Sequence, residues 1–293
     1  MPPRRVAVEV EGRQLSLSNL DKVMYPEVGF TKGQVIDYYS RIAPFLLPHL
    51  RDRPLTMKRY PDGVTGEFFY EKRIPSHAPE WVRRERVGKI EYIVCDDLPT
   101  LVWLANMADL ELHPSLSLVD DIDRPAVMAF DLDPGPPAGI PECCEVAFLL
   151  RDALSQLGLE SFAKTSGSKG IQVYVPLNVE HVDYDHGTKA LSKALARLLE
   201  TRHPKLIVSQ QRKDLRKGKV LIDWSQNDEA KTTVSVYSLR ARERPTVSTP
   251  LRWEELEDPA ALVFEASDVL ERVEEHGDLY APVVELQQEL PDL

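Results

Sequence analysis

The sequence predicts an α+β fold in which largely antiparallel β-sheets are flanked by helices. At 293 residues, 43% of them hydrophobic, the chain can bury a large core in a single domain over residues 1–293. Segments with the period of strands and segments with the period of helices both occur along it. They do not alternate strictly, as the βαβ units of a parallel sheet would, so an antiparallel arrangement is favoured.

Strands are predicted where apolar and polar residues alternate, or where a short apolar run ends in polar residues. The expected strands lie within residues 6–20, 89–97, 126–133, 161–177, 219–227 and 232–242. A tight turn interrupts residues 161–177, and residues 51–75 are rich in turns with short strands between them. Residues 1–30 are therefore a region of N-terminal strands.

Helices are predicted where apolar residues recur every three or four positions. The first is expected to start after Thr31, whose hydroxyl can cap it, and to run to about His49. Further helices are expected over residues 98–113, 143–159 and 187–202, with closing helices within 252–277. Residues 251–293 are therefore an acidic, helical C-terminal region.

Several classes of protein are disfavoured by the composition. No stretch approaches the apolar length of a transmembrane helix, and the first residues lack the apolar core of a signal peptide. The chain has three cysteines, and neither their number nor their spacing suggests a disulfide framework or a zinc site. We therefore expect a cytoplasmic protein whose thiols are reduced.

The net charge of −11 argues at first against a nucleic-acid partner. The charge is uneven, however, because residues 251–293 hold 2 Lys/Arg against 13 Asp/Glu and so account for all of it. Residues 1–250 hold 34 residues of each sign, and residues 205–219 have six basic residues and one acidic. A local basic surface is therefore still possible, although such a stretch is also typical of a solvated loop.

Asp131 and Asp133 stand one residue apart at the end of the apolar run "MAFDLD". Alternate side chains of a strand share a face, so both carboxylates are expected to point the same way. Carboxylates so close repel each other, and a divalent cation removes the repulsion. Oxygen ligands on a rigid strand suit Mg²⁺ or Mn²⁺. Taken alone, the pair is more typical of a strand end that meets solvent.

A third carboxylate strengthens the metal hypothesis. Asp223 ends the apolar run "VLID" and polar residues follow it. Three carboxylates at the ends of two strands can hold two metal ions about 3.5–4 Å apart, which is the arrangement used for in-line phosphoryl or nucleotidyl transfer. We therefore expect Asp131, Asp133 and Asp223 to be the metal ligands and the catalytic residues.

The segment "TSGSKG" (165–170) lies between two predicted strands. Backbone N–H groups in such a turn can bind an anion, and Lys169 adds a positive charge. The spacing is not that of a Walker loop. By itself the segment is also typical of a plain hairpin turn.

The motifs of this chain, taken in their order along the sequence, resemble those of the polymerase domain of bacterial ligase D. That domain is a member of the archaeo-eukaryotic primase superfamily and serves non-homologous end joining. The motifs are FDLDPG, TSGSKG before an apolar strand, IDWSQN and KTTVSVYSLRAR, preceded by NLDKVMYPEVGFTKGQVIDYY, RPLTMKRYPDG and LELHP. The likeness covers nearly the whole chain and implies the primase-polymerase fold. It implies either a stand-alone relative or a domain excised from a larger ligase.

The resemblance assigns a role in nucleotide binding to ten residues. The residues are Lys58, Phe69, Tyr70, His113, Ser166, Ser168, Lys169, Gly170, Gln172 and Arg240. The TSGSKG residues and Arg240 would hold the triphosphate, and His113 would lie near the sugar and phosphates. Phe69 or Tyr70 would stack on the incoming base, and stacking tolerates any base.

The resemblance also implies contacts with DNA. Lys22 and Lys32 match the family's pocket for the 5′-phosphate of a downstream strand, and Arg216 matches a loop that contacts the DNA end or template. Lys32 follows the expected helix cap, where backbone N–H groups favour phosphate. Two solvated surface lysines are the alternative.

One position departs from the family. Gln172 stands where the second motif usually has histidine, and a glutamine can donate a hydrogen bond but carries no proton or charge for catalysis. We expect catalysis to survive, with nucleotide affinity or preference affected.

The sequence thus predicts a template-dependent nucleotidyltransferase that adds nucleotides to primer ends at short gaps or breaks in DNA. By resemblance it would prefer ribonucleotides and Mn²⁺ over Mg²⁺, act at the bacterial nucleoid, and work with a ligase and the Ku end-binding protein. A metal-dependent phosphohydrolase and a non-catalytic module that binds DNA ends are the alternatives.

Overall fold

The computed structural model describes residues 5–291, so the two ends of the predicted domain, 1–4 and 292–293, lie outside the described residues. The chain forms two compact units. The first takes the described residues up to Pro114 together with Val234–Val247 and Phe264–Gly277; the second takes Ser115–Thr233, Ser248–Val263 and the described residues from Asp278 on. The predicted acidic C-terminal region is thus shared between both units. A single domain over 1–293 stays a prediction.

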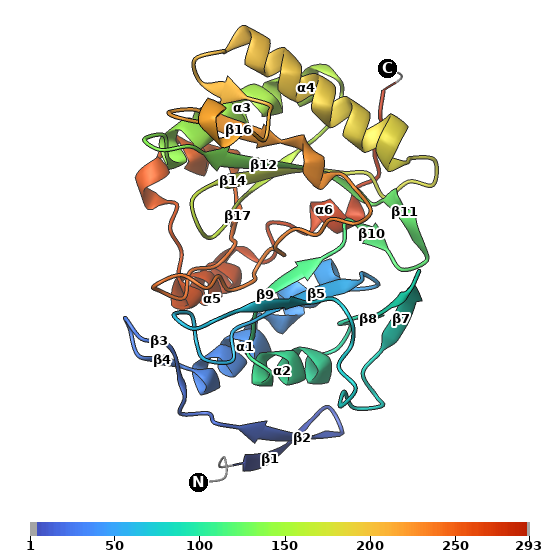
Figure 1. Ribbon diagram of the computed structural model, residues 1–293, viewed down its shortest axis with the longest axis vertical. Coiled ribbons are helices and arrows are strands. Elements are labelled where there is room, and N and C mark those ends of the chain that lie inside the picture. Colours follow the sequence, from blue (N-terminus) through green and yellow to red (C-terminus); the bar gives the residue numbers. More distant parts are fainter. Residues whose placement is uncertain (1–4, 292–293) are drawn as a thin grey trace. The chain divides into compact units, whose positions relative to one another are not determined.

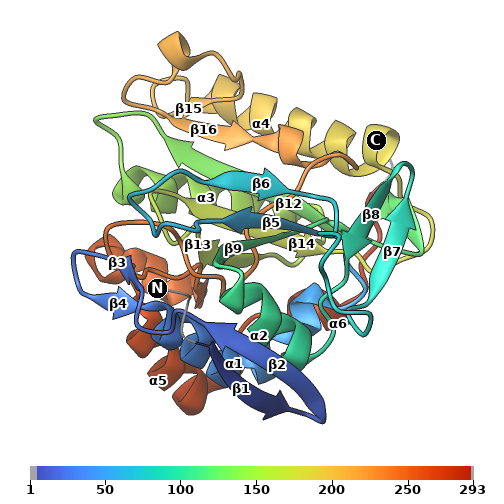
Figure 2. The same cartoon turned by 60° about the horizontal axis from the view of Figure 1, so that its bottom comes forward.

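The first unit is built around the short strand β5. Its elements are β1 (Arg5–Val10), β2 (Arg13–Ser18), β3 (Val23–Tyr25), β4 (Phe30–Thr31), α1 (Lys32–Leu50), β5 (Leu55–Arg59), β6 (Phe69–Glu71), β7 (Arg84–Val87), β8 (Ile90–Ile93), α2 (Leu98–Asn106), β9 (Asp109–Pro114) and α5 (Ala266–His276). β6 and β9 pair with opposite edges of β5, both antiparallel, and Figure 2 shows the three strands side by side. This arrangement sets side chains of β6 and β9 on either side of those of β5.

The first helix begins as expected. The Thr31 hydroxyl accepts a hydrogen bond from the backbone of Gln34, whose side chain accepts one from the backbone of Thr31. This reciprocal cap satisfies two N–H groups that the first turn leaves without intrahelical partners. The cap places Lys32 at the first position of α1.

The second unit has a mixed, largely antiparallel six-stranded sheet and a separate two-stranded sheet of β10 and β11. Its elements are β10 (Ser117–Leu118), β11 (Asp121–Pro125), β12 (Val127–Pro134), α3 (Ile140–Gln156), β13 (Phe162–Thr165), β14 (Ile171–Pro176), α4 (Lys189–Arg202), β15 (Ile207–Val208), β16 (Val220–Asp223), β17 (Pro250–Leu251) and α6 (Pro282–Glu285), with 3-10 turns at Lys213–Leu215, Trp224–Gln226, Trp253–Glu257 and Pro259–Ala261 and a π turn at Tyr184–Thr188. The strand order is β15-β16-β12-β14-β13-β17, so β12 is central. α3 and α4 contact each other and β12, which they cover on one side of the sheet (Figure 1).

The prediction of a helix over residues 98–113 is wrong in its second half. α2 ends at Asn106, and Ala108 has a φ of 59°, which no helix continues. Residues Asp109–Pro114 then form β9. Leu110 and Leu112, both fully buried, alternate with Glu111 and His113. His113 therefore projects from a strand rather than from a helix end.

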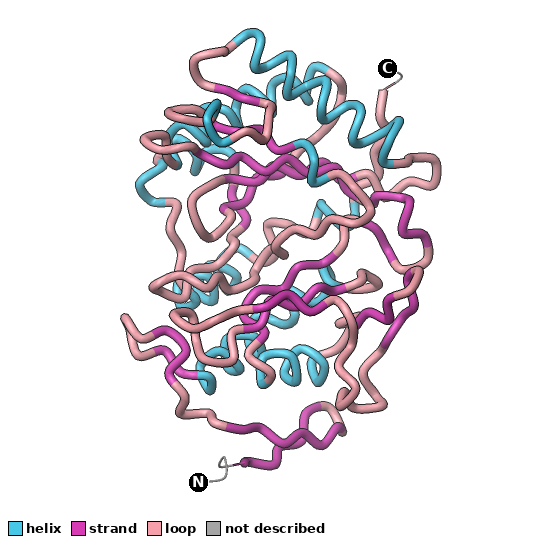
Figure 3. The backbone as a smooth tube through the Cα atoms, in the orientation of Figure 1, coloured by secondary structure: helices cyan, strands magenta, loops and turns pink. Residues whose placement is uncertain are grey.

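The prediction of a strand over residues 232–242 is also wrong. Much of the chain outside the main elements lies in loops (Figure 3), and residues 232–242 are among them, with only isolated bridges at Thr232 and Leu239. Tyr237 has a φ of 62°, a conformation that interrupts a strand. Its ring is fully buried, so packing outweighs the β-propensity of this run.

Two expectations about the whole chain are met where the structure describes it. Cys95, Cys143 and Cys144 are buried free thiols. Among residues 5–291, no helix combines the length and apolar character needed to cross a membrane.

Candidate active site

The three predicted carboxylates lie on two paired strands of the second unit. β12 pairs with β16 on one side, where Asp131 is opposite Asp223. It pairs with β14 on the other side, where Asp131 is opposite Gln172. Asp133 lies two residues further along β12, and Leu132 between them is fully buried. The register thus places Asp131 between Asp223 and Gln172, with Asp133 next to it along its own strand.

The electrostatics of Asp131 reflect this crowding. Burial, then the neighbouring carboxylate of Asp223 and next that of Asp133, raise the pKa of Asp131 to about 6, against the lowering effects of a hydrogen bond from Gln172 and the charge of Lys164. Repulsion between acids that desolvation has brought together is the expected cause of such a shift. The positive charge of Lys164 therefore does not offset the effects of burial and of the two neighbouring carboxylates on Asp131.

The other two carboxylates are held by protein donors. Arg216 forms an ion pair with Asp133, with 3.3 Å between Nη1 and Oδ2. Asp223 caps the turn that follows β16: its Oδ1 accepts from the backbone and hydroxyl of Ser225 at 2.9 and 2.7 Å, and its Oδ2 accepts from Gln226 at 3.0 Å. With the side chains turned in this way, no three His, Cys, Asp or Glu groups within residues 5–291 are arranged to hold a metal ion.

The donor set nevertheless fits a divalent cation in its chemistry. All three groups are carboxylates, which Mg²⁺ and Mn²⁺ prefer, and the register places Asp131 opposite Asp223 with Asp133 two residues along the same strand. The side chain of Asp133 is 56% exposed and forms an ion pair with Arg216. Rotation of an exposed side chain is fast, so Asp133 can turn toward Asp131 without a change of backbone.

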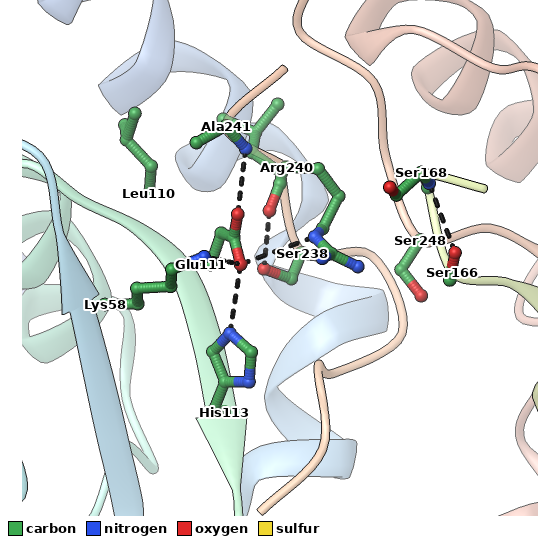
Figure 4. A network of polar contacts seen from close by, with 12 residues as sticks. Lys58, Leu110, Glu111, His113, Ser166, Ser168, Ser238, Arg240, Ala241 and Ser248 are labelled. Carbon is green, nitrogen blue, oxygen red and sulfur yellow. Dashed lines mark hydrogen bonds and ion pairs between the residues drawn. The ribbon is translucent and has the colours of Figure 1, made fainter. Parts of the chain in front are cut away.

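The TSGSKG turn packs directly against β12. A Cβ on Gly170 would lie 2.1 Å from the carbonyl oxygen of Leu132, so only glycine fits there. Inside the turn, the Ser166 hydroxyl accepts hydrogen bonds from the backbone of Ser168 and of Gly170, the first of which Figure 4 shows. Lys169 is exposed at its tip. The close contact holds the turn beside the strand that bears the carboxylates.

A buried lysine that the sequence reasoning did not single out completes this region. Lys164, at 0% exposure, donates a hydrogen bond to Oε1 of Gln172 and one of 2.8 Å to Ser248. Gln172 in turn hydrogen-bonds Asp131. The amide thus links a buried ammonium to a predicted metal ligand. A role of Gln172 in binding phosphate stays a prediction.

The first unit contains a second buried polar cluster, centred on Glu111 (Figure 4). Glu111 is 2% exposed, and its Oε2 lies 3.2 Å from Nζ of Lys58, 3.1 Å from Nε2 of His113 and 3.4 Å from Nε of Arg240. Its Oε1 accepts from the Tyr60 hydroxyl at 3.3 Å and from the backbone of residue 241 at 3.0 Å. Three predicted nucleotide-binding residues therefore share one acceptor that the sequence reasoning missed.

The aromatic residues of β6 divide between two faces. Tyr70 of β6 pairs with Lys58 of β5. Nζ of Lys58 lies 5.5 Å from the ring centroid of Tyr70 and 4.6 Å from the ring centroid of Phe68. Phe69 is opposite Arg59 instead, with the guanidinium carbon 5.1 Å from its ring. Tyr70 also packs edge-on against His113. Of the two predicted stacking residues, Tyr70 thus belongs with the Glu111 cluster and Phe69 does not.

The predicted phosphate-binding lysines line one cavity of about 460 Å³ in the first unit, with Arg59 and His77 also in its wall. Lys22 Nζ donates to the carbonyl of Pro61 at 2.6 Å, and Lys32 Nζ donates to the carbonyl of Ser18 at 2.8 Å. Burial, then the charges of Lys22 and Arg59, lower the pKa of Lys32 to about 8. Lys22 also pairs with the exposed Asp62 at 2.8 Å, so the two lysines share a cavity, and their role in phosphate binding stays a prediction.

Comparison with known proteins decides the family. A family model described as the LigD primase-polymerase domain matches residues 31–280. The chain belongs to the LigD primase-polymerase family. It is 42% identical over 276 residues to the multifunctional non-homologous end joining protein LigD of Mycolicibacterium smegmatis, covering 92% of this chain and 36% of that protein. The bifunctional LigD of Bacillus subtilis is 33% identical over 265 residues, covering 90% of this chain and 43% of that protein.

A solved structure agrees with the sequence matches. The polymerase domain of Mycobacterium tuberculosis ligase D, in complex with DNA, has a TM-score of 0.86 and 39% identity, covering 94% of this chain and 99% of that one. The predicted fold class, antiparallel sheets with helices in a LigD polymerase domain, is confirmed. The chain spans little more than a third of the length of the M. smegmatis relative, so the activities of whole LigD proteins are matters of proposal here.

Proposed function

We propose that this protein is a template-dependent nucleotidyltransferase of DNA end joining. The 3′-hydroxyl of a primer would attack the α-phosphate of a nucleoside triphosphate at a short gap or break. The single observation that carries the proposal is the register of the second unit, which sets Asp131 opposite Asp223 beside Asp133 in a chain of the LigD primase-polymerase family.

Asp131, Asp133 and Asp223 would hold divalent metal, Mn²⁺ in preference to Mg²⁺. The bound ions would supply a lower pKa for the attacking hydroxyl and charge stabilisation for the phosphates. Asp131 would keep its orientation through Gln172, which the buried Lys164 holds in turn. Asp133 would exchange its contact with Arg216 for this role.

The remaining predicted residues would bind the nucleotide and the DNA. Ser166, Ser168, Lys169 and Gly170 of the TSGSKG turn would hold the triphosphate, and Tyr70, which projects beside Lys58, would stack on a base. Lys22 and Lys32 would take a 5′-phosphate in the cavity they share, and Arg216 would contact the DNA end or template. The mycobacterial polymerase domain solved with DNA and the end-joining names of the relatives support this assignment. A ligase and the Ku protein would be partners, and ribonucleotides the preferred substrates.

The test is incubation of the protein with a gapped duplex bearing a downstream 5′-phosphate, Mn²⁺ and labelled triphosphates. Template-directed elongation of the primer is the expected result. Release of free phosphate without elongation would identify a phosphohydrolase, and binding of the duplex without either reaction would identify a non-catalytic end-binding module. Either of these two results contradicts the proposal. Ribonucleotides and deoxyribonucleotides, supplied separately, measure the sugar preference.

A further inference from the structure

Glu111 has more hydrogen-bond donors around it than a side chain at this depth usually meets. A carboxylate offers about four lone-pair sites, and four donors form hydrogen bonds of 3.0–3.3 Å with Glu111. A fifth donor, Nε of Arg240, lies 3.4 Å from Glu111 as an ion pair. Two of them, Lys58 and Arg240, carry full positive charges. Burial alone would raise the pKa of Glu111, but the hydrogen bond from His113 and the charges of Arg240 and Lys58 outweigh burial and hold that pKa below its usual range. Glu111 is therefore a carboxylate at any working pH.

The same surroundings determine the charge of His113. Burial lowers the pKa of His113, and the charges of Arg240 and Lys58 lower it further, against the raising effects of the hydrogen bond to Glu111 and of its charge. The net direction is downward from the ordinary value, so the imidazole is neutral at pH 7. One ring nitrogen of a neutral imidazole carries a proton and donates, and the other accepts.

Glu111 decides which nitrogen has which role. Its ionised carboxylate can only accept, and Nε2 of His113 lies 3.1 Å from it, so the proton is on Nε2. Nδ1 is consequently an acceptor. Figure 4 shows this second nitrogen on the side of the ring away from Glu111, and the described residues give it no hydrogen-bond partner. The side chain of His113 keeps 12% exposure, which leaves its edge accessible to a ligand.

We propose that Glu111 is a positioning residue that fixes His113 as a hydrogen-bond acceptor for a hydroxyl group of the nucleotide sugar. An acceptor nitrogen repels phosphate oxygens, which are acceptors themselves, and attracts a hydroxyl, which can donate. Lys58, tied to the same carboxylate, has N–H groups left for anionic parts of the ligand. The inference rests on the proposed function, because it takes a nucleotide as the ligand, and it assigns His113 to the sugar rather than to the phosphates.

The first measurement needs no catalysis. Long-range ¹H–¹⁵N spectra of the wild-type protein at pH 7, with His113 assigned by comparison with His113→Phe, report which ring nitrogen carries the proton. The expected result is a neutral ring protonated at Nε2. A ring protonated at Nδ1, or at both nitrogens, would overturn the inference.

The second measurement is nucleotide binding by calorimetry. Ribonucleoside triphosphate is compared with its 2′-deoxy and 3′-deoxy forms, so that the two analogues distinguish which hydroxyl is read. We expect one analogue to bind about tenfold more weakly to the wild type, as loss of one hydrogen bond to a desolvated site predicts. His113→Phe keeps the ring packing against Tyr70 and removes the acceptor, so it should bind the three forms alike.

A double-mutant cycle shows whether Glu111 acts through His113. An amide has one acceptor atom where a carboxylate has two, so in Glu111→Gln at least two of the five donors lose their partner. Glu111→Gln should reduce the sugar discrimination of the wild type at least about threefold, yet change nothing further in the His113→Phe background. Equal effects of Glu111→Gln in both backgrounds would contradict the inference. Glu71→Gln is the matched control, because Glu71 pairs with Arg59 and should leave discrimination intact.

These outcomes separate the inference from the proposed function. Sugar discrimination that depends on His113, without primer extension, would support the inference and refute the polymerase. Primer extension without any sugar discrimination in the wild type would support the polymerase and refute the inference.

Discussion

Glu111 and Asp131 are both acidic residues on strands, and the charges that surround them are opposite in sign. Glu111 is one carboxylate among five donors, which hold its pKa below the usual range although burial acts to raise it. Asp131 is one of three neighbouring carboxylates, and burial followed by the charge of Asp223 raises its pKa to about 6. The first cluster has a surplus of positive charge, and the second a surplus of negative charge.

This difference separates a site that is complete within the protein from one that is not. The donors around Glu111 hydrogen-bond or pair with its carboxylate, so this cluster is held together by contacts within the protein. Asp131 has two carboxylates as neighbours, and a divalent cation would relieve their repulsion. Under the proposed function, the Glu111 cluster would position the ligand and the Asp131 cluster would hold the metal. The following predictions test that contrast.

The largest effect is expected from Asp131→Asn. Primer extension should fall on the order of 10³-fold or more, because a metal ligand acts on the transition state directly. The melting temperature should not fall, since the change removes a repelling charge. Asp223→Asn should have the same effects on primer extension and on the melting temperature. Extension by either variant at wild-type rates in Mn²⁺ would refute the metal assignment.

Glu111→Ala, unlike Asp131→Asn, should reduce the stability of the protein. Removing one member of a buried charged cluster leaves Lys58 and Arg240 without their counter-charge and should lower the free energy of unfolding by about 3–5 kcal/mol. Urea unfolding measures it. Asp214→Ala is the control, because its ion pair with Arg212 is more than half exposed and should contribute less than about 1 kcal/mol. Similar losses in both variants would show that Glu111 is not a buried centre of charge.

Lys169→Ala tests the turn beside the Asp131 cluster. Lys169 would contact charge that the nucleotide carries already in its ground state, so its loss should raise KM for triphosphate about tenfold and leave kcat nearly unchanged. Lys231→Ala, another exposed lysine of the second unit, is the control. A KM that stays at the wild-type value would reduce the TSGSKG turn to a structural hairpin.

The smallest effect concerns pH and the cavity of Lys22 and Lys32. Since burial lowers the pKa of Lys32 to about 8, its ammonium is charged at pH 7 and increasingly neutral above pH 8. A bound phosphate raises that pKa again, so the preference of gapped DNA for a 5′-phosphate over a 5′-hydroxyl should decline only a few-fold between pH 7 and 9.5. Lys32→Arg stays charged and should show no decline. A wild-type preference that is flat over this range would exclude Lys32 from phosphate recognition.

Local patterns carried most of the fold prediction. The strand that ends in Asp131 and Asp133, the capped helix after Thr31 and the hairpin around TSGSKG all depend on neighbours in sequence, and all are observed. The two errors, over 98–113 and 232–242, occur where residues with positive φ at Ala108 and Tyr237 redirect the chain. Propensity gives no warning of such positions. The alternation of Leu110 and Leu112 was the available sign of a strand.

The missed site residues depend on distant contacts. Glu111 pairs with Arg240, which lies 129 positions further along the chain. Lys164 hydrogen-bonds Ser248, which lies 84 positions further along. A lone glutamate in "LELHP" or a lone lysine before "TSGSKG" is unremarkable until the fold buries it. Similarly, Phe69 and Tyr70 are adjacent in sequence, and only their pairing with Arg59 and Lys58 assigns them to different faces.

The most direct test of the contrast between the two acidic clusters is Mn²⁺ binding to the wild type, Asp131→Asn and Glu111→Gln, followed by electron paramagnetic resonance without nucleotide or DNA. Removing Asp131 takes away a ligand, whereas removing the charge of Glu111 takes away a group already surrounded by donors. The account predicts that the wild type and Glu111→Gln bind Mn²⁺ with similar affinity and that Asp131→Asn binds it at least about tenfold more weakly. Equal binding by Asp131→Asn and the wild type, or loss of binding in Glu111→Gln alone, would contradict it.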